Sequence, residues 1–181
     1  MSLKNLNVSR KTHKFLLNKL KGLELNEESG VVLAPDVGSA KMSQSYAKKL
    51  NIGFALIDKR RPKANQAEVA KLVGDLKNKD VIIIDDMIDT AGTLCNAAET
   101  AINEGAKSVI AVATHPVLSG GAIKKLKNSP ISKVIVCNTN KLNENQEFDK
   151  LEIISVADIF GESIKRIVEG TSLSSMFHDF N

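Results

Sequence analysis

The sequence predicts an α/β fold in which a parallel sheet is flanked by helices. Short apolar runs, most of them rich in β-branched residues, recur along the chain and are typical of strands. Segments with the apolar spacing of helices lie between them, and this alternation is typical of parallel strands joined by crossover helices. With 181 residues, of which 43% are hydrophobic, the chain is long enough for one domain around one core.

The first thirty residues predict an amphipathic helix that leads into this domain. Ser9 is the expected N-cap, and a polar stretch that ends at Gly30 closes the segment. Its apolar stripe consists of Phe15, Leu16, Leu20 and Leu23. We therefore expect a helical leader over residues 1–30 and the main domain over residues 31–181.

The later elements follow in regular order. Strands are predicted at residues 31–34, 54–57, 81–84, 109–113, 134–136 and 153–154. Helices are predicted around residues 41–50, 93–104, 122–126 and 157–168, with Gly105 where a C-cap belongs. Residues 68–74 suit a helix or a short strand equally well, and the pattern leaves both open.

The bulk composition excludes several classes of protein. A net charge of +4, with lysines scattered over the chain, does not indicate a nucleic-acid-binding protein, and no apolar run is long enough to span a membrane. Cys95 and Cys137 lack the spacing of a redox or zinc site, and no secretory signal precedes them, so we expect a cytoplasmic location. The three histidines show no spacing typical of transition-metal ligands.

The strongest functional signal follows the strand predicted at residues 81–84. Residues 85–93 read Asp-Asp-Met-Ile-Asp-Thr-Ala-Gly-Thr, so two acids lead into a small, hydroxyl-rich turn that opens a helix. Backbone N–H groups at such a helix start can bind a phosphate, and Gly92 lets the main chain approach it. Asp85 and Asp86 can accept hydrogen bonds from two vicinal hydroxyls. These features together predict a pentose phosphate site; the alternative is that the acids only cap the helix.

A basic loop follows the strand predicted at residues 54–57. Lys59, Arg60, Arg61 and Lys63 place four cations within five positions. Such a loop can close over a polyphosphate and stabilise the charge that develops during phosphoryl-type transfer. The alternative is an ordinary solvated run of charges.

A third loop joins the strand at residues 31–34 to the following helix. Its backbone amides could hold a diphosphate, and Asp36 could support Mg²⁺ directly or through water. The residues concerned are Asp36, Gly38, Ser39, Ala40 and Lys41. The alternative is a simple strand-to-helix turn with Ser39 as the N-cap.

The acid-rich segment resembles the phosphoribosyl-binding motif of the type I phosphoribosyltransferase fold. From about residue 31 to residue 177 the chain resembles the C-terminal half of the ribose-phosphate diphosphokinases (PRPP synthetases). Three further segments carry this resemblance: residues 57–62 (Ile-Asp-Lys-Arg-Arg-Pro), 114–120 (Thr-His-Pro-Val-Leu-Ser-Gly) and 172–177 (Ser-Leu-Ser-Ser-Met-Phe).

The resemblance implies a role for each loop. Lys59 and Arg61 would stabilise the transition state, and Ser172 and Ser174 would form part of a regulatory phosphate site between subunits. Ribose 5-phosphate would be bound by Asp85, Asp86, Asp89, Thr90, Ala91, Gly92 and Thr93. The diphosphate of ATP would be held by residues 36–41, with Mg²⁺ at Asp36. We expect a homo-oligomer, or association with an amino-terminal half that contributes most of the nucleotide site.

Two departures from the family pattern keep alternatives open. Ser39 stands where the family usually has glycine, and Met42 where it often has arginine. One alternative is therefore a non-catalytic regulatory partner of a synthetase, although Lys59 and Arg61 are intact. Another is a PRPP-dependent phosphoribosyltransferase, for which the sequence offers no segment that would recognise a nucleobase. We expect the isolated chain to bind ribose 5-phosphate but to make little or no PRPP.

Overall fold

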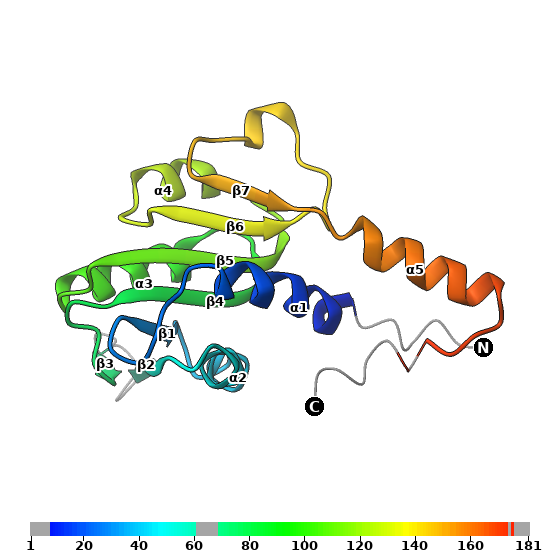
Figure 1. Cartoon of the computed structure of the whole chain (residues 1–181). Helices are drawn as coiled ribbons and strands as arrows, with labels where there is room; N and C mark the ends of the chain where they lie inside the picture. The colour runs from blue at the N-terminus through cyan, green and yellow to red at the C-terminus, as the bar shows by residue number, and fades with distance from the viewer. Residues whose placement is uncertain (1–7, 61–68, 174, 176–181) are drawn as a thin grey trace.

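The computed structural model describes residues 8–60, 69–173 and 175 (Figure 1). Within these residues the strands are β1 (Gly30–Ala34), β2 (Gly53–Arg60), β3 (Val69–Val73), β4 (Asp80–Ile88), β5 (Ser108–Pro116), β6 (Lys133–Cys137) and β7 (Leu151–Ile154). They form one sheet in the order β3-β2-β1-β4-β5-β6-β7, and every neighbouring pair except β2 and β3 is parallel. The predicted α/β fold, a parallel sheet flanked by helices, is confirmed.

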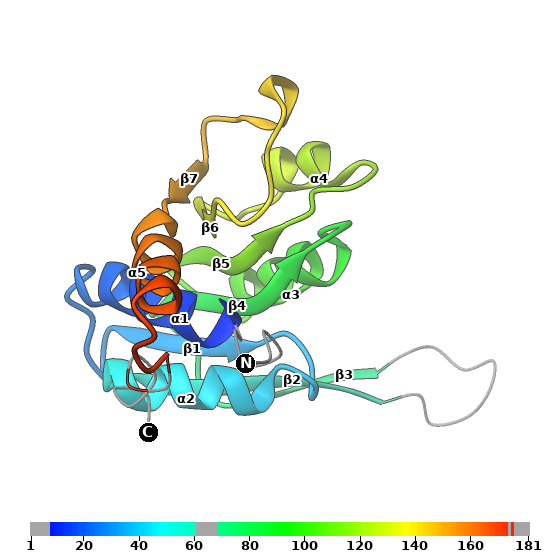
Figure 2. The same cartoon turned by 90° about the vertical axis from the view of Figure 1, so that its right-hand side faces the viewer.

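Helices cover both faces of this sheet. They are α1 (Val8–Lys21), α2 (Ala40–Leu50), α3 (Gly92–Asn103), α4 (Ala122–Asn128) and α5 (Ala157–Val168), with a short 3-10 turn, η2 (Glu144–Gln146), before β7. Figures 1 and 2 show α1 and α2 on one face and α3 and α4 on the other. The bounds agree with the sequence prediction to within a few residues.

Successive side chains of the central strands point to opposite faces of the sheet, so the core is divided between these two faces. Ile82 and Ile84 of β4 belong to the cluster under α1 and α2, whereas Val81 and Ile83 belong to the cluster under α3 and α4. All four side chains are fully buried. A strand buried on both sides needs a continuous apolar run, which is why the run at residues 81–84 predicts this central position.

The segment that the sequence left undecided is an antiparallel edge strand. β3 returns along β2, with Leu56 opposite Val73. A parallel return would need a crossover of a dozen or more residues, and only residues 61–68 lie between the two strands. Gly74 ends β3 with φ +115, and a Cβ there would lie 2.7 Å from the Cβ of Ala55. Glycine is therefore required at this position.

The first helix packs on the sheet and ends at Lys21, a few residues before the polar stretch that was expected to close it. Leu16 and Leu20 of α1 are buried against the core that includes Ile82. The expectation that Ser9 is the N-cap is wrong, because Ser9 lies within α1. The side chain of Asn26 accepts hydrogen bonds from two following backbone amides, which fixes a turn before β1.

The last helix, α5, extends from the carboxyl edge of the sheet and leaves part of its apolar surface exposed (Figures 1 and 2). Ile159 and Ser163 are buried, whereas Phe160, Ile164 and Val168 are exposed. No helix in the described part of the chain is long and apolar enough to cross a membrane.

Candidate functional site

The candidate site lies where β1 and β4 run side by side. The chain moves from β1 to β2 in one direction across the sheet and from β4 to β5 in the other, so the order of strands reverses between β1 and β4. In open parallel sheets, ligands bind beyond the carboxyl ends of the strands at such a reversal. Two of the three loops singled out in the sequence follow β1 and β4, and the fold therefore places them next to each other.

Asp85, near the carboxyl end of β4, is half-buried and has an unusual pKa. Burial raises the pKa of its carboxyl from 3.8 to about 6, and the charges of Asp86 and Asp36 act in the same direction. The backbone N–H of Asp86 donates to Asp85 Oδ1 at 2.8 Å and opposes this rise. Asp86 itself is exposed. The two neighbouring acids therefore differ in environment although they are adjacent in sequence.

Asp36, in the loop after β1, lies close enough to Asp85 for its charge to raise the pKa of that carboxyl. Its Oδ1 accepts the backbone N–H of Ser39 at 2.9 Å, which orients the carboxylate within its own loop. In the described part of the chain neither Asp36 nor Asp85, Asp86 or Asp89 forms an ion pair. The site therefore concentrates negative charge that no cationic side chain described in the structure neutralises.

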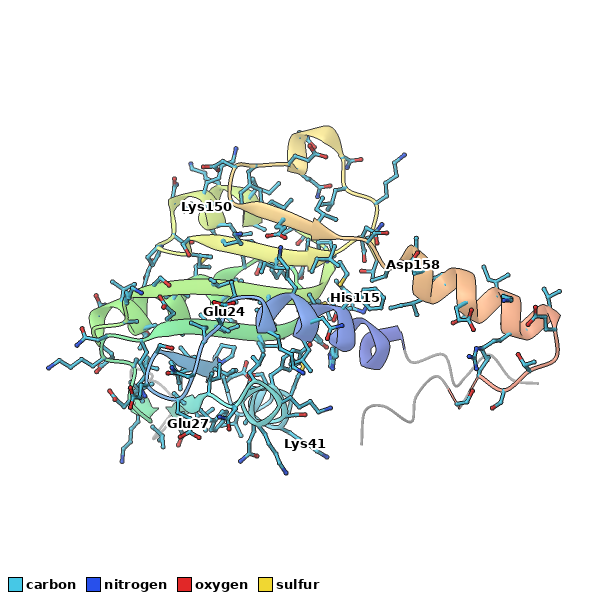
Figure 3. All side chains as sticks on the ribbon, viewed as in Figure 1. Glu24, Glu27, Lys41, His115, Lys150 and Asp158 are labelled. Atoms are coloured by element: carbon cyan, nitrogen blue, oxygen red, sulfur yellow. The ribbon has the colours of Figure 1, made fainter. Side chains whose placement is uncertain are left out.

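The alternative in which the Ser39 side chain only caps α2 is not supported. Ser39 occupies the N-cap position of α2, but its hydroxyl donates to the Asp36 carbonyl at 3.0 Å and does not cap the helix. Met42 packs against the core under α1 and α2. Lys41 is exposed in the first turn of α2, among side chains that project outward from that helix (Figure 3).

The turn between β4 and α3 presents backbone N–H groups at a helix start. Ala91 adopts the left-handed conformation, with φ 59, and α3 begins at Gly92. Within the described residues, the N–H groups of Thr90, Ala91, Gly92 and Thr93 donate to no protein acceptor. A non-glycine residue with positive φ costs about 1 kcal/mol and is often found at functional sites. The turn has the features of an anion site.

Gly92 has no role in packing within the protein itself. A Cβ added there would find Thr90 Oγ1 as its nearest contact, at 4.0 Å. Its φ does not fall in the range that favours glycine. The space in front of this residue is therefore open, as a ligand that approaches the main chain would require.

The loop after β5 supports this turn, a role that the sequence did not reveal. The backbone N–H groups of Val117 and Leu118 donate to the Ile88 carbonyl at 3.0 and 2.9 Å. Ser119 donates from its amide to the Asp89 carbonyl at 3.1 Å and from its hydroxyl to the Asp89 carboxylate. In the sequence, residues 114–120 stand out only through a resemblance to a family. Hydrogen bonds between segments so far apart in the chain leave no pattern in the sequence.

Part of the remaining predicted site lies outside the described residues. Lys59 is in β2, but its side chain is not described, and Arg61 falls in the segment 61–68. Ser174 is also outside the described residues, whereas the Ser172 carbonyl accepts a hydrogen bond from Arg166 at 2.9 Å near the end of α5. The roles assigned to these residues stay predictions.

No group of three or more histidine, cysteine or carboxylate side chains in the described part of the chain could hold a metal ion by itself. Magnesium, however, commonly binds through one or two carboxylates and completes its shell with water and substrate phosphates. Asp36 and Asp85, two unpaired carboxylates close enough to influence each other, fit that pattern.

The chain is similar to known proteins of one group. Residues 61–178 match the family model described as phosphoribosyl synthetase-associated domain. A ribose-phosphate pyrophosphokinase of Aquifex aeolicus is 52% identical over 150 residues, which cover 83% of this chain and 48% of that protein. The phosphoribosylpyrophosphate synthetase structure of Mycobacterium smegmatis has 33% identity and a TM-score of 0.79, and the match covers 87% of this chain and 50% of that one.

A more distant structure shows how widely the fold is shared. The APRTase of Giardia lamblia superposes with a TM-score of 0.55 at 16% identity, covering 72% of this chain and 77% of that one, which supports the phosphoribosyltransferase type of fold alone. The chain spans about half the length of the curated relatives it matches. Because the family model covers well over half of its residues, the chain belongs to the phosphoribosyl synthetase-associated domain family.

Proposed function

We propose that this chain is the ribose 5-phosphate-binding half of a ribose-phosphate diphosphokinase, which transfers the diphosphate group of ATP to the C1 hydroxyl of ribose 5-phosphate. One observation carries the proposal: the half-buried Asp85 and the exposed Asp86 stand one turn before a helix start whose N–H groups have no protein acceptor among the described residues. Backbone N–H groups of this kind can bind an anion, and the two carboxylates can accept hydrogen bonds from a diol. The curated relatives bear the name of this activity.

In this proposal the β4 segment holds the sugar phosphate. The amides of residues 90–93 bind the 5-phosphate, while Asp85 and Asp86 accept hydrogen bonds from two ribose hydroxyls. Asp89, which is already bonded to Ser119, fixes the turn between these groups. The C1 oxygen then forms a bond to the β-phosphorus of ATP, the bond between that phosphorus and the oxygen retained by AMP breaks, and the hydroxyl proton passes to solvent.

The loop after β1 is proposed to face the transferred diphosphate. Its members are Asp36, Gly38, Ser39, Ala40 and Lys41. Mg²⁺ would be held by Asp36 with Asp85 close by, and when bound it would neutralise charge on the phosphate oxygens. Lys59 and Arg61 would stabilise the charge of the transition state, and Ser172 and Ser174 would contribute to a regulatory phosphate site.

The isolated chain is expected to bind ribose 5-phosphate without efficient synthesis of PRPP. Its relatives are about twice as long, so the nucleotide site would be completed by an amino-terminal half or by other copies of the chain in an oligomer. We expect these partners, and a cytoplasmic location, as part of the same proposal.

Calorimetry tests the proposal directly. Titration of the chain with ribose 5-phosphate should give a saturable heat that disappears when Asp85 and Asp86 are both replaced by Asn. A matched control replaces the exposed Glu27 and Glu28 by Gln, which keeps the same net charge change at a distant turn. If the chain gave no heat, or if the control lost as much affinity as the double Asn variant, the proposal would be wrong.

A further inference from the structure

His115 stands on β5 beside the acid pair of β4. In the ladder between these strands, Asp85 pairs with Ala113 and Met87 pairs with His115. Side chains two residues apart on a strand share a face, so His115 lies on the same face as Asp85. From the spacing of strands and residues, its Cα is about 8 Å from that of Asp85, one pleat nearer the carboxyl edge. Figure 3 shows His115 at this edge of the sheet.

One edge of the imidazole is anchored to the end of the next strand. His115 Nδ1 lies 2.9 Å from the hydroxyl of Thr139, which in turn donates to the Thr114 carbonyl at 3.0 Å. The Thr139 hydroxyl has one proton, for which the Thr114 carbonyl at 3.0 Å is a nearer acceptor than Asn140 Oδ1 at 3.4 Å. When the hydroxyl donates to either of them it accepts from His115, and the neutral ring that fits this arrangement carries its proton on Nδ1 and a lone pair on Nε2.

The other ring nitrogen is available for a ligand. Nε2 has no hydrogen-bond partner among the residues that the structure describes. Thr139 follows β6, on the side of β5 away from β4. Since the two nitrogens lie on different edges of the ring, the bond to Thr139 occupies the Nδ1 edge and leaves the Nε2 edge without a partner among the described residues.

The position of His115 is fixed by the same bonds that support the β4 turn. The loop that follows it is held to Ile88 and Asp89 by three backbone hydrogen bonds. Leu118 in this loop is buried and left-handed, with φ 51, a conformation that persists only where its surroundings enforce it. A ring bonded at one edge, on a backbone whose following loop is fixed, is suited to position a ligand.

We propose that His115 is a further sugar-binding residue, whose Nε2 accepts a hydrogen bond from a hydroxyl of the pentose held by Asp85 and Asp86. This inference rests on the proposed function and extends it to a residue on a third strand. A lone pair on Nε2 suits a hydroxyl, whereas the phosphate of the same ligand would be bound by the N–H groups of the turn after β4. Substitution of His115 should therefore lower the affinity for the sugar and leave the affinity for inorganic phosphate unchanged.

Two variants distinguish the role of Nδ1 from the role of Nε2. His115→Asn places an amide N–H near the position of Nδ1 and can keep the bond to Thr139, but it has no group at Nε2. His115→Gln places an amide near Nε2 instead. Each is compared with the unmodified chain by calorimetry with ribose 5-phosphate, by calorimetry with inorganic phosphate, and by urea unfolding.

The expected result is specific to the sugar. His115→Asn should weaken ribose 5-phosphate binding roughly tenfold, the loss of one hydrogen bond, with unchanged phosphate affinity and unchanged unfolding. His115→Gln should recover most of the affinity for ribose 5-phosphate. Equal binding by all three proteins, an equal loss for phosphate, or a loss that follows reduced stability would each overturn the role of His115 and leave the proposed function intact. If the unmodified chain does not bind ribose 5-phosphate, the proposed function fails, and this inference fails with it.

Discussion

Replacement of Asp85 by Asn should stabilise the protein while it weakens ligand binding. Burial of this carboxyl raises its pKa from 3.8 to about 6, so the folded protein favours the protonated form. The contribution of the protonated Asp85 carboxyl to the free energy of unfolding is fully present below pH 3.8 and is lost as the pH rises through 6. At pH 8 the ionised group then costs at most roughly 3 kcal/mol. Because the side chain is partly exposed, solvent screening reduces this to about 1 kcal/mol.

The Asn side chain retains an Oδ1 that can accept the Asp86 N–H, so the variant removes the charge without removing this hydrogen bond. Urea unfolding followed by circular dichroism should show the variant more stable at pH 8, and the difference should fall to about half at pH 5, where Asp85 is mostly protonated in the folded state. Ribose 5-phosphate affinity should fall about 10- to 100-fold, the value of hydrogen bonds to a charged group. Asp86→Asn, at the exposed neighbour, should change stability by less than about 0.5 kcal/mol. A stability difference that is absent, or that does not change with pH, would refute the reasoning.

Three further substitutions test other parts of the structure. Gly92→Ala should leave the free energy of unfolding unchanged or slightly higher, because the added methyl has free space, yet it should abolish ribose 5-phosphate binding in calorimetry; Gly161→Ala in α5, which also has free space, should bind normally. Gly74→Ala should cost more than about 2 kcal/mol in urea unfolding, since its Cβ would clash with Ala55 and its φ is positive; a loss below about 1 kcal/mol would contradict the geometry. Leu20→Ala should cost about 3 kcal/mol in the same assay, because α1 packs on the sheet, and a cost near zero would show that the helix is separable.

The regular elements could be predicted because they follow from local patterns. The apolar run at residues 81–84 predicts a central strand, and the helix over residues 157–168 has the predicted bounds. The segment around Leu72 could not be decided, because only the length of the connection to β2 requires an antiparallel return. Ser9 was wrongly placed as a cap because helix ends depend on more than one residue.

The sequence indicated which residues to examine for a site but not how they interact. The sequence indicated Asp85 and Asp36 separately, yet only the pairing of β1 with β4 brings them close enough for one charge to affect the other. The bonds from Ser119 to Asp89, and from His115 to Thr139, join strands far apart in the chain. Such contacts depend on strand order, which apolar spacing alone does not specify.

The central pairing of β1 with β4 also has a consequence for how the protein folds. Val31 pairs with Val81, and the whole of α2, β2 and β3 lies between them in the chain. Closing so long a loop costs chain entropy before any contact repays it, so this step should come late and limit the folding rate. A ligand that contacts both loops can bind only afterwards, and by mass action it would protect the amides of these two strands from hydrogen exchange with solvent.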